Sequence, residues 1–283
     1  MSESIFLFAG QDIFLPAGDS AGAALAGPGV PERLASGLAQ RGRRDYRTGH
    51  ARFAALSLDD AGAAEAAARG LIRVPLRQAI GLFADELMRP ALKGLALLNW
   101  LEGARFCGSC GSPLEDVPET DEEQGSRRCP ACGRPHFPRI SPAAIVLVRR
   151  RGERGQEALL ARNARFPPGR FGLLAGFVET GETLEETAVR EVREEAGIEI
   201  TGLRYSRSQP WPFPDSLMIA FTADWAGGEA RPDGREIAEL RWCLPGDFPG
   251  IPPPGSVARA LLDDFAADAV RGLSPAPIAS GFS

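Results

Sequence analysis

The segment from Gly176 to Ile198, GFVETGETLEETAVREVREEAGI, constrains the fold more than any other part of this chain. Thr183 and Glu186 have the spacing of a helix capping box, and Gly197 stands where a helix needs a residue that tolerates positive φ. Between these signals, apolar residues recur at every fourth position: Leu184, Ala188, Val192 and Ala196. The pattern predicts one helix over residues 184–196 with a single buried stripe.

Three glutamates share one turn of this predicted helix. At about 100° per residue, Glu191 and Glu195 lie next to each other at one edge of the apolar stripe, with Glu194 one step round. Like charges at these spacings repel, and Arg190 and Arg193 relieve the repulsion only in part. Glu-rich helix faces are usually just solvated surface. Carboxylates are also the ligands that Mg²⁺ prefers, so the cluster favours a metal site when it stands in a longer pattern.

That longer pattern is present. The arrangement Gly-x5-Glu-x7-Arg-Glu-U-x-Glu-Glu-x-Gly-U, in which U is apolar, is filled at every defined position from Gly176 to Ile198. This is the Nudix box, and the chain resembles the Nudix hydrolases. The resemblance implies an α/β fold, a Nudix α/β/α sandwich with a mixed sheet. It also implies that Mg²⁺ or Mn²⁺ assists hydrolysis of a nucleoside diphosphate linked to another group.

The resemblance assigns roles within the box. Glu191 and Glu195 are the implied metal ligands, and Glu194 is either a ligand or the base that orients the attacking water. Arg190 is implied to hold the glutamates in place through ion pairs. More than one catalytic ion is expected, because a single Mg²⁺ usually takes only one or two protein carboxylates.

Two metal contacts are implied outside the helix. An apolar run, 171–175, ends at Gly176, so we expect the chain to turn there and the carbonyl of Ala175 to reach the metal. Glu236 is implied as a further metal-binding glutamate, with Glu239 as its nearest competitor.

A second motif, SQPWPFPDS at residues 208–216, follows the box. Its prolines stiffen the backbone and fix the directions of Trp211 and Phe213, which suits a flat heterocycle. It resembles the SQPWPFPxS signature of the NADH pyrophosphatase branch, which implies cleavage of NADH, and of NAD⁺ more weakly, to AMP and nicotinamide mononucleotide. The implied substrate-binding residues are Gln209, Pro210, Trp211, Pro212, Phe213, Pro214, Asp215 and Ser216. The alternative is a proline-rich loop whose rings pack on the core.

Three more positions match this branch. Arg77 is implied to contact a substrate phosphate, Phe137 to stack on a base, and Ala258, in PPPGSVAR, to touch substrate through its backbone. The structural alternatives are a surface arginine, a core phenylalanine and a rigid proline loop. At Ala17, where some members of the branch carry a substrate-contacting lysine, this chain departs from the pattern.

Four cysteines form two CxxC pairs, Cys107 with Cys110 and Cys129 with Cys132. This spacing predicts one structural Zn²⁺ per chain, because two knuckles supply four thiolates to a tetrahedral ion and leave no open position for catalysis. A disulfide pair would need an oxidising compartment.

The N-terminus has no basic region and only a short apolar run, so no secretory signal is predicted and we expect a cytoplasmic protein. Cys243 is interpreted as a core residue and His136 as exposed or hydrogen-bonded.

The organisation predicted is an N-terminal α+β domain over 1–103, a zinc ribbon over 104–138 and a Nudix domain over 139–283. Within these, strands are expected at 51–58 and 140–148, and helices at 82–101 and through Phe265.

No apolar segment approaches the length that spans a bilayer, so no membrane partner is expected. A net charge of −5 argues against broad binding of nucleic acid. The family resemblance implies a homodimer that acts on a small dinucleotide.

Two other functions remain open. The same site fits removal of a 5′ NAD cap from RNA, with the arginines of the ribbon guiding the trailing strand: Arg127, Arg128, Arg134 and Arg139. A protein of another class, a non-catalytic sensor of ADP-ribose or NAD, needs no such cluster of carboxylates, and the intact glutamates count against it.

Overall fold

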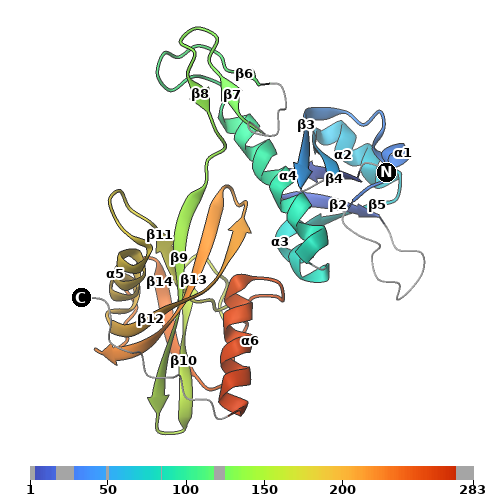
Figure 1. The fold of residues 1–283 in the computed structure, drawn as a ribbon. Helices are drawn as coiled ribbons and strands as arrows, with labels where there is room; N and C mark the ends of the chain where they lie inside the picture. Colours follow the sequence, from blue (N-terminus) through green and yellow to red (C-terminus); the bar gives the residue numbers. More distant parts are fainter. Residues whose placement is uncertain (1–3, 17–28, 49–50, 84, 118–124, 272–283) are drawn as a thin grey trace. The chain divides into compact units, whose positions relative to one another are not determined.

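The computed structural model describes residues 4–16, 29–48, 51–83, 85–117 and 125–271, so Ala17 lies outside the described residues (Figure 1). The chain divides into two compact units. Unit 1 comprises Met1–Ile140 with Pro210–Ser216, and unit 2 comprises Ser141–Gln209 with Leu217–Ser283. The finer division at residues 103 and 138 stays a prediction.

Unit 1 is built on a five-stranded sheet in the order β3-β4-β1-β2-β5. Its strands are β1 Ser4–Ala9, β2 Asp12–Pro16, β3 Gln40–Thr48, β4 Ala51–Leu58 and β5 Leu71–Pro75. β1 and β4 are parallel, and the other neighbouring pairs are antiparallel. The helices are α1 Glu32–Ala35, α2 Asp60–Ala68, α3 Leu76–Ala79, the 3-10 turn η1 Ile80–Leu82, and α4 Asp85–Gly103. The strand predicted at 51–58 is confirmed, and the helix predicted at 82–101 begins after the η1 turn.

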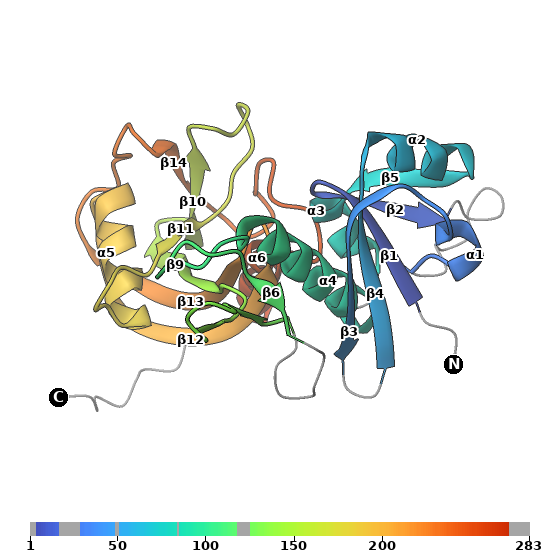
Figure 2. The same cartoon turned by 90° about the horizontal axis from the view of Figure 1, so that it is seen from above.

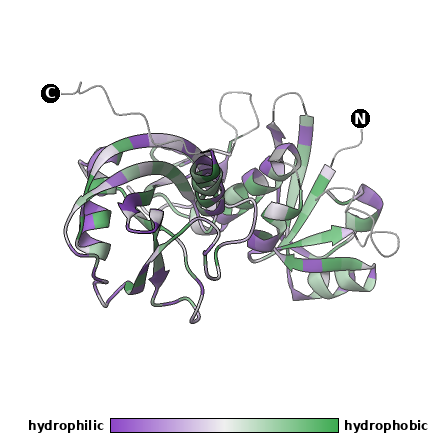
Figure 3. Ribbon diagram, turned by 90° about the horizontal axis from the view of Figure 1, so that it is seen from below, coloured by the Kyte–Doolittle hydropathy of each residue, from purple (hydrophilic) through white to green (hydrophobic). Residues whose placement is uncertain are grey.

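Hydrophobic residues run along much of this sheet (Figure 3). Phe6 and Phe8 of β1 pack on the α4 side, whereas Ile5 and Leu7 face the core that α1 and α2 help to form. Figure 2 shows α4 and α1 on opposite sides of the sheet. Successive residues of a strand point to opposite faces, so β1 is buried on both. Unit 1 is therefore an α+β structure with two cores.

A three-stranded ribbon follows α4, with β6 Glu115–Asp116, β7 Arg127–Arg128 and β8 Pro135–His136 in the order β6-β7-β8. Arg127 joins it to α4, because its Nη1 donates to the carbonyls of Leu101 and Ala104 at 3.3 and 2.5 Å. These carbonyls belong to the unsatisfied C-terminal end of the helix, where a cation is favoured. Arg127 thus has a structural contact and is only 16% exposed in its side chain.

Unit 2 contains a six-stranded sheet in the order β12-β13-β9-β10-β14, with β11 paired to β9. The strands are β9 Ser141–Gly152, β10 Gly155–Asn163, β11 Leu174–Phe177, β12 Glu199–Trp211, β13 Ser216–Gly227 and β14 Ile237–Cys243. The helices are α5 Leu184–Ala196 and α6 Val257–Val270. The strand predicted at 140–148 corresponds to β9, and α6 passes through Phe265 as predicted.

The two helices of unit 2 lie on opposite faces of its sheet (Figure 1). Along β9, Ala144, Val146 and Val148 belong to the core under α5. Ile145 and Leu147 belong to the core under α6. The arrangement is the predicted α/β/α sandwich. No helix in the described part of the chain is both long and apolar enough to cross a membrane.

Candidate functional site

Helix α5 has the predicted boundaries and caps. The Thr183 hydroxyl accepts from the backbone N–H of Glu186 at 3.2 Å, and the Glu186 carboxylate accepts from the N–H of Thr183 at 2.8 Å. At the other end Gly197 adopts φ 69°. Ala188, Val192 and Ala196 are buried, and Leu184 packs at the edge of the same core. The helix therefore holds its carboxylates at a fixed rotation relative to the sheet.

Glu195 is a buried carboxyl beside β11. Its Oε2 accepts from the backbone N–H of Ala175 at 3.0 Å, and the residue is 6% exposed. Burial raises the pKa of Glu195 to about 8, and the charges of Glu191, Glu236 and Asp233 act in the same direction. A carboxyl in this state is stabilised by a nearby cation. The N–H of Ala175 thus contacts a predicted metal ligand, and the expected contact of the Ala175 carbonyl with the metal stays a prediction.

Glu191 lies against Gly176. A Cβ on Gly176 would stand 1.8 Å from Oε1 of Glu191, so only glycine leaves room for this carboxylate. The expected turn at Gly176 is wrong: the residue lies inside β11, opposite Ala144 of β9. Gly176 is required because the helix packs close to the strand, not because the chain reverses. Burial raises the pKa of Glu191 despite its contact with Arg190.

Arg190 joins three carboxylates. Its Nε and Nη2 donate to Glu182 at 2.6 and 2.9 Å, and its Nη1 donates to Glu191 at 2.8 Å and to Glu194 at 3.0 Å. Nη2 also donates to the carbonyl of Phe177 at 3.0 Å, which ties the group to β11. The expected ion-pairing of Arg190 with the glutamates is present. The contact is bidentate toward Glu182, the geometry in which Arg–carboxylate pairs are strongest.

Glu182 is a member of this network to which sequence reasoning gave no role. Arg190, the N–H of Glu179 and the hydroxyl of Thr187 all donate to its carboxylate, and these contacts lower the pKa of Glu182 to about 2. The pattern marked its position eight residues before Arg190, in the loop that precedes α5. It did not show that the loop folds back to bring the two together.

Glu236 and Glu239 differ in their surroundings. The charge of Glu236 raises the pKa of both Glu191 and Glu195. Its backbone N–H donates to Asp233, which also accepts from the N–H groups of neighbouring residues and so shapes the turn before β14. Glu239 instead pairs with Arg162 at 3.3 Å and with Arg241 at 2.9 Å. Of the two competitors, Glu236 acts on the helix carboxylates.

The donor set suits hard divalent cations. Glu191, Glu194, Glu195 and Glu236 supply only carboxylate oxygens, and Arg190 neutralises part of their charge while Glu182 occupies much of Arg190. Burial, together with the charges of neighbouring carboxylates, raises the pKa of half-buried Glu191 and of buried Glu195, and a bound cation would favour their charged forms. These oxygens do not converge as tightly as the cysteine sulfurs described below, which fits ions that complete their shells with water and phosphate.

The amide of Gln209, at the end of β12, is bonded to backbone. Its Nε2 donates to the carbonyl of Gly255 at 2.7 Å, and its Oε1 accepts from the N–H of Val257 at 2.8 Å. Ala258 follows in the first turn of α6 and is buried in the core beneath that helix. The predicted substrate-binding residue Gln209 therefore positions the segment that carries Ala258.

The remaining residues of the aromatic segment, Pro210–Ser216, belong to unit 1. Phe213 is 8% exposed within the core under α4, and Trp211 meets its ring edge-on at a centroid distance of 5.0 Å. The guanidinium of Arg77 lies 4.5 Å from the centroid of Phe213. Asn99 of α4 donates to the carbonyls of Pro212 and Pro214 at 3.1 and 2.9 Å. Phe213 thus packs on the core, which was the alternative to substrate binding. Its ring is not exposed on both faces for a heterocycle to stack on.

Two other predicted residues lie near the end of the ribbon. Phe137 is 58% exposed, so its ring is accessible for stacking. Arg139 lies 3.5 Å from Asp215, which links the end of the ribbon to the aromatic segment inside unit 1. His136 is half-buried, and its Nε2 is buried without a hydrogen-bond partner in the described structure, so the interpretation of His136 as exposed or hydrogen-bonded is wrong.

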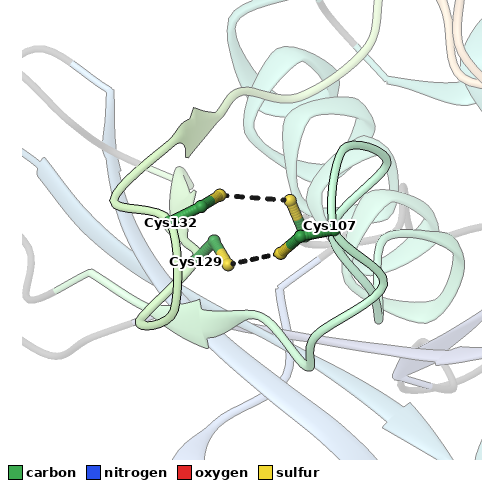
Figure 4. Close-up of side chains that lie close together, drawn as sticks. Cys107, Cys129 and Cys132 are labelled. Atoms are coloured by element: carbon green, nitrogen blue, oxygen red, sulfur yellow. Dashed lines mark hydrogen bonds between the residues drawn. The ribbon is translucent and has the colours of Figure 1, made fainter.

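The four cysteines of the ribbon converge on one point. Their sulfurs lie within 4.8 Å of one another, and Figure 4 shows Cys107, Cys129 and Cys132 facing one another across two turns. The Sγ–Sγ distances are 3.7 Å for Cys107 with Cys132 and 3.5 Å for Cys110 with Cys129. Four thiolates about 2.3 Å from a tetrahedral ion stand about 3.8 Å apart, whereas disulfide sulfurs stand about 2.05 Å apart. The cluster can hold a metal ion and contains no disulfide.

Local backbone builds each knuckle. Gly111 and Gly133 both adopt φ 73°, and their N–H groups donate to the carbonyls of Cys107 and Cys129. Ser112 donates to the sulfur of Cys110 through its hydroxyl and its backbone, and these bonds lower the pKa of Cys110 to about 6. A thiol in this state readily becomes the thiolate that a metal requires. Cys243 is buried beside α6, as expected for a core residue.

Comparison with known proteins gives this geometry a family. A model of the NUDIX domain matches residues 139–264, which include β11, α5 and Glu236. The NAD-capped RNA hydrolase NudC of Chromobacterium violaceum is 44% identical over 200 residues, which are 71% of this chain and 72% of the relative. The protein of the same name from Deinococcus radiodurans is 44% identical over 68% of this chain and 67% of its own. The chain belongs to the NudC branch of the Nudix family.

A NUDIX hydrolase structure from Nitrosomonas europaea covers 59% of this chain and 93% of its own chain, with 27% identity and a TM-score of 0.48. At that score the likeness adds nothing to the assignment. As a Nudix protein of this branch, the chain places its box on β11 and α5 of unit 2. The cysteine cluster lies outside the matched NUDIX domain, in the ribbon of unit 1.

Proposed function

We propose that this protein hydrolyses the pyrophosphate bond of the NAD group, both in free NADH or NAD⁺ and at the 5′ end of NAD-capped RNA. The observation that carries the proposal is the cluster of Glu191, Glu194 and Glu195, held by Arg190 and Glu182 against β11. The 44% identity to proteins named NAD-capped RNA hydrolases supports the choice of substrate. A non-catalytic sensor has no need of a network that maintains so many carboxylates.

The reaction adds water across one P–O–P bond. With NADH the products are AMP and reduced nicotinamide mononucleotide, and with capped RNA they are a 5′-phosphorylated RNA and nicotinamide mononucleotide. Divalent ions supply charge neutralisation of the diphosphate and a water of lowered pKa when bound. We infer that Glu191, Glu195 and Glu236 hold more than one Mg²⁺ or Mn²⁺, and that Glu194 is a ligand or the water-orienting base.

The chain's own groups keep this arrangement in place. Arg190 spaces Glu191 from Glu194, and Glu182 fixes Arg190 through two hydrogen bonds. The N–H of Ala175 orients Glu195 toward the cluster. Preorganised groups avoid reorganisation during the reaction, which is the main source of electrostatic catalysis. For the nucleotide, exposed Phe137 is the aromatic ring we infer to be available for stacking on a base.

We further infer one Zn²⁺ per chain in the ribbon, where it stabilises folding. The free thiols of the cluster support a cytoplasmic location, because thiols stay reduced there. The homodimer implied by the family and the three-part division at residues 103 and 138 are part of the same proposal.

The test is to incubate purified protein with NADH and Mn²⁺ and to separate the products by chromatography, with Glu195→Gln beside it. We expect AMP and reduced nicotinamide mononucleotide from the native protein and at least a hundredfold less from the variant. A parallel reaction with NAD-capped RNA at equal concentration ranks the two substrates. Tight binding of NADH without turnover in saturating Mn²⁺ would instead support the sensor.

A further inference from the structure

A second cleft lies in unit 1, and none of its lining residues belongs to the proposed active site. It is formed by β3, the last turns of α4 and the ribbon, and we call it the β3 cleft. Its volume is about 510 Å³, a size that in proteins accommodates small organic ligands. Leu98, Leu101 and Leu114 form an apolar part of its wall. The cleft can therefore enclose a ligand with a hydrophobic portion.

The charged residues of the cleft are mostly arginines. Four line it, and two acidic residues accompany them: Arg41, Arg43, Arg105 and Arg127, with Glu102 and Asp116. Three of these arginines have a carboxylate nearby: Arg43 pairs with Asp45 at 2.7 Å, Arg41 lies 3.8 Å from Asp60, and Arg127 pairs with Asp116 at 2.7 Å. Within the described residues no carboxylate pairs with Arg105, which is exposed. Arg105 is therefore the lining arginine that is most available to an anion.

A buried arginine, Arg44, shares the carboxylate of Asp116 with Arg127. Arg44 is 7% exposed, and its Nη1 lies 3.4 Å from Oδ2 of Asp116. The same carboxylate accepts from Nε of Arg127 at 2.7 Å, so two guanidinium groups share one acid. Nε and Nη2 of Arg44 are buried with no partner in the described structure. One carboxylate for two guanidinium groups leaves one positive charge in excess beside the cleft, which favours an anion there.

We propose that the β3 cleft binds the phosphate group of a nucleotide, with the phosphate at Arg105 and the sugar or base against the leucines. Arginine is suited to this because its planar fork donates two hydrogen bonds to one phosphate. Glu102 repels a ligand of high charge, so a single phosphate ester fits better than a triphosphate. The phosphate comes either from a free mononucleotide or from an RNA chain, and this function goes beyond the hydrolysis proposed above.

The test uses the full chain without divalent ions and measures amide hydrogen exchange segment by segment. The probes are inorganic phosphate, AMP, adenosine and a short 5′-phosphorylated RNA. We expect AMP to protect residues 41–44 and 101–116, phosphate to protect them more weakly, and adenosine not at all. If the RNA protects residues 41–44 and 101–116 and AMP does not, the bound phosphate belongs to an RNA strand. If AMP alone protects them, it belongs to a free nucleotide. Binding at the Nudix box is seen separately, in residues 175–195.

Charge-reversal variants localise the effect. Arg105→Glu and Arg41→Glu, both at exposed side chains, are expected to weaken AMP binding at the β3 cleft on the order of tenfold, because each replaces a favourable charge by a repulsive one. The matched control is Arg154→Glu, an exposed arginine in the turn between β9 and β10. The proposal is overturned by adenosine protecting as well as AMP, by no probe protecting these segments, or by all three variants weakening binding equally.

Discussion

The carboxylate of Glu191 fills the space that a side chain on Gly176 would need, with only 1.8 Å between Oε1 and the position of a Cβ. We predict that Gly176→Ala moves Glu191 and lowers kcat/KM for NADH on the order of a hundredfold, because misplacing a catalytic group by about 1 Å costs that much. The measurement is initial rates with Mn²⁺. Gly172→Ala is the matched control, since a Cβ there meets nothing closer than 3.9 Å. Normal rates in the Gly176→Ala enzyme would show that the position of Glu191 does not matter for catalysis.

The raised pKa of Glu195 predicts a pH-dependent stability. Its folded pKa of about 8 lies above the ordinary value of 4.5, so the stability that its proton contributes is fully present below pH 4.5 and is lost as the pH rises toward 8. The Glu195→Gln variant does not lose this stability as the pH rises, because glutamine does not titrate. In buffer without Mg²⁺ or Mn²⁺, the Tm of the variant minus the Tm of the native protein should increase by roughly 5–10 °C between pH 5 and pH 8.5.

Thermal unfolding across a pH series checks this, with Mn²⁺ added in a second series. The ion should raise the Tm of the native protein at pH 8.5 by more than that of Glu195→Gln, because it takes the place of the proton on Glu195 only in the native protein, whereas Glu191 and Glu236 are present in both. A Tm difference that is the same at every pH would show that Glu195 is charged in the metal-free fold.

What the sequence could predict here depends on how local the determining contacts are. The limits of α5 follow from Thr183, Glu186 and Gly197, which act within one turn of the helix ends. The requirement for glycine at position 176 cannot be predicted in this way, because the carboxylate of Glu191 comes close to Gly176 only after α5 packs on β11. Phe213 illustrates the same limit: its burial under α4 depends on a segment from between β12 and β13 joining unit 1. Motif patterns identified the residues but not these partners.

Glu236 and Glu239 form a test pair three residues apart. Glu236 adds its charge to the helix carboxylates, whereas Glu239 is held by Arg162 and Arg241. We predict that Glu236→Gln raises the Mn²⁺ concentration needed for half-maximal rate about tenfold, and that Glu239→Gln changes it less than twofold. A titration of activity against Mn²⁺ measures both. The opposite ranking would make Glu239 the ligand.

Gln209 is predicted to act through the segment before α6. Gln209→Ala removes two hydrogen bonds to the backbone of Gly255 and Val257, which should lower the free energy of unfolding by about 2 kcal/mol. Because Ala258 follows this segment, KM for NADH should rise more than kcat falls. Denaturant unfolding and steady-state kinetics give the two results. The control is Ser208→Ala, whose exposed hydroxyl makes one long contact to Tyr205; an unchanged KM in Gln209→Ala would leave Gln209 a purely structural role.

Loss of the ribbon metal should affect the two units differently. Cys110→Ser removes one of four converging sulfurs. We predict that zinc content falls from the one ion per chain inferred above to a small fraction, because a closed four-thiolate site loses most of its affinity with one ligand. The ribbon then no longer holds Arg127 against the carbonyls at the end of α4, so proteolysis after Arg127 and Arg128 should accelerate. Unit 2 has its own two cores and should stay resistant. Cys243→Ala, which alters a cysteine outside the cluster, should keep its zinc; equal zinc loss in both variants would place the metal elsewhere.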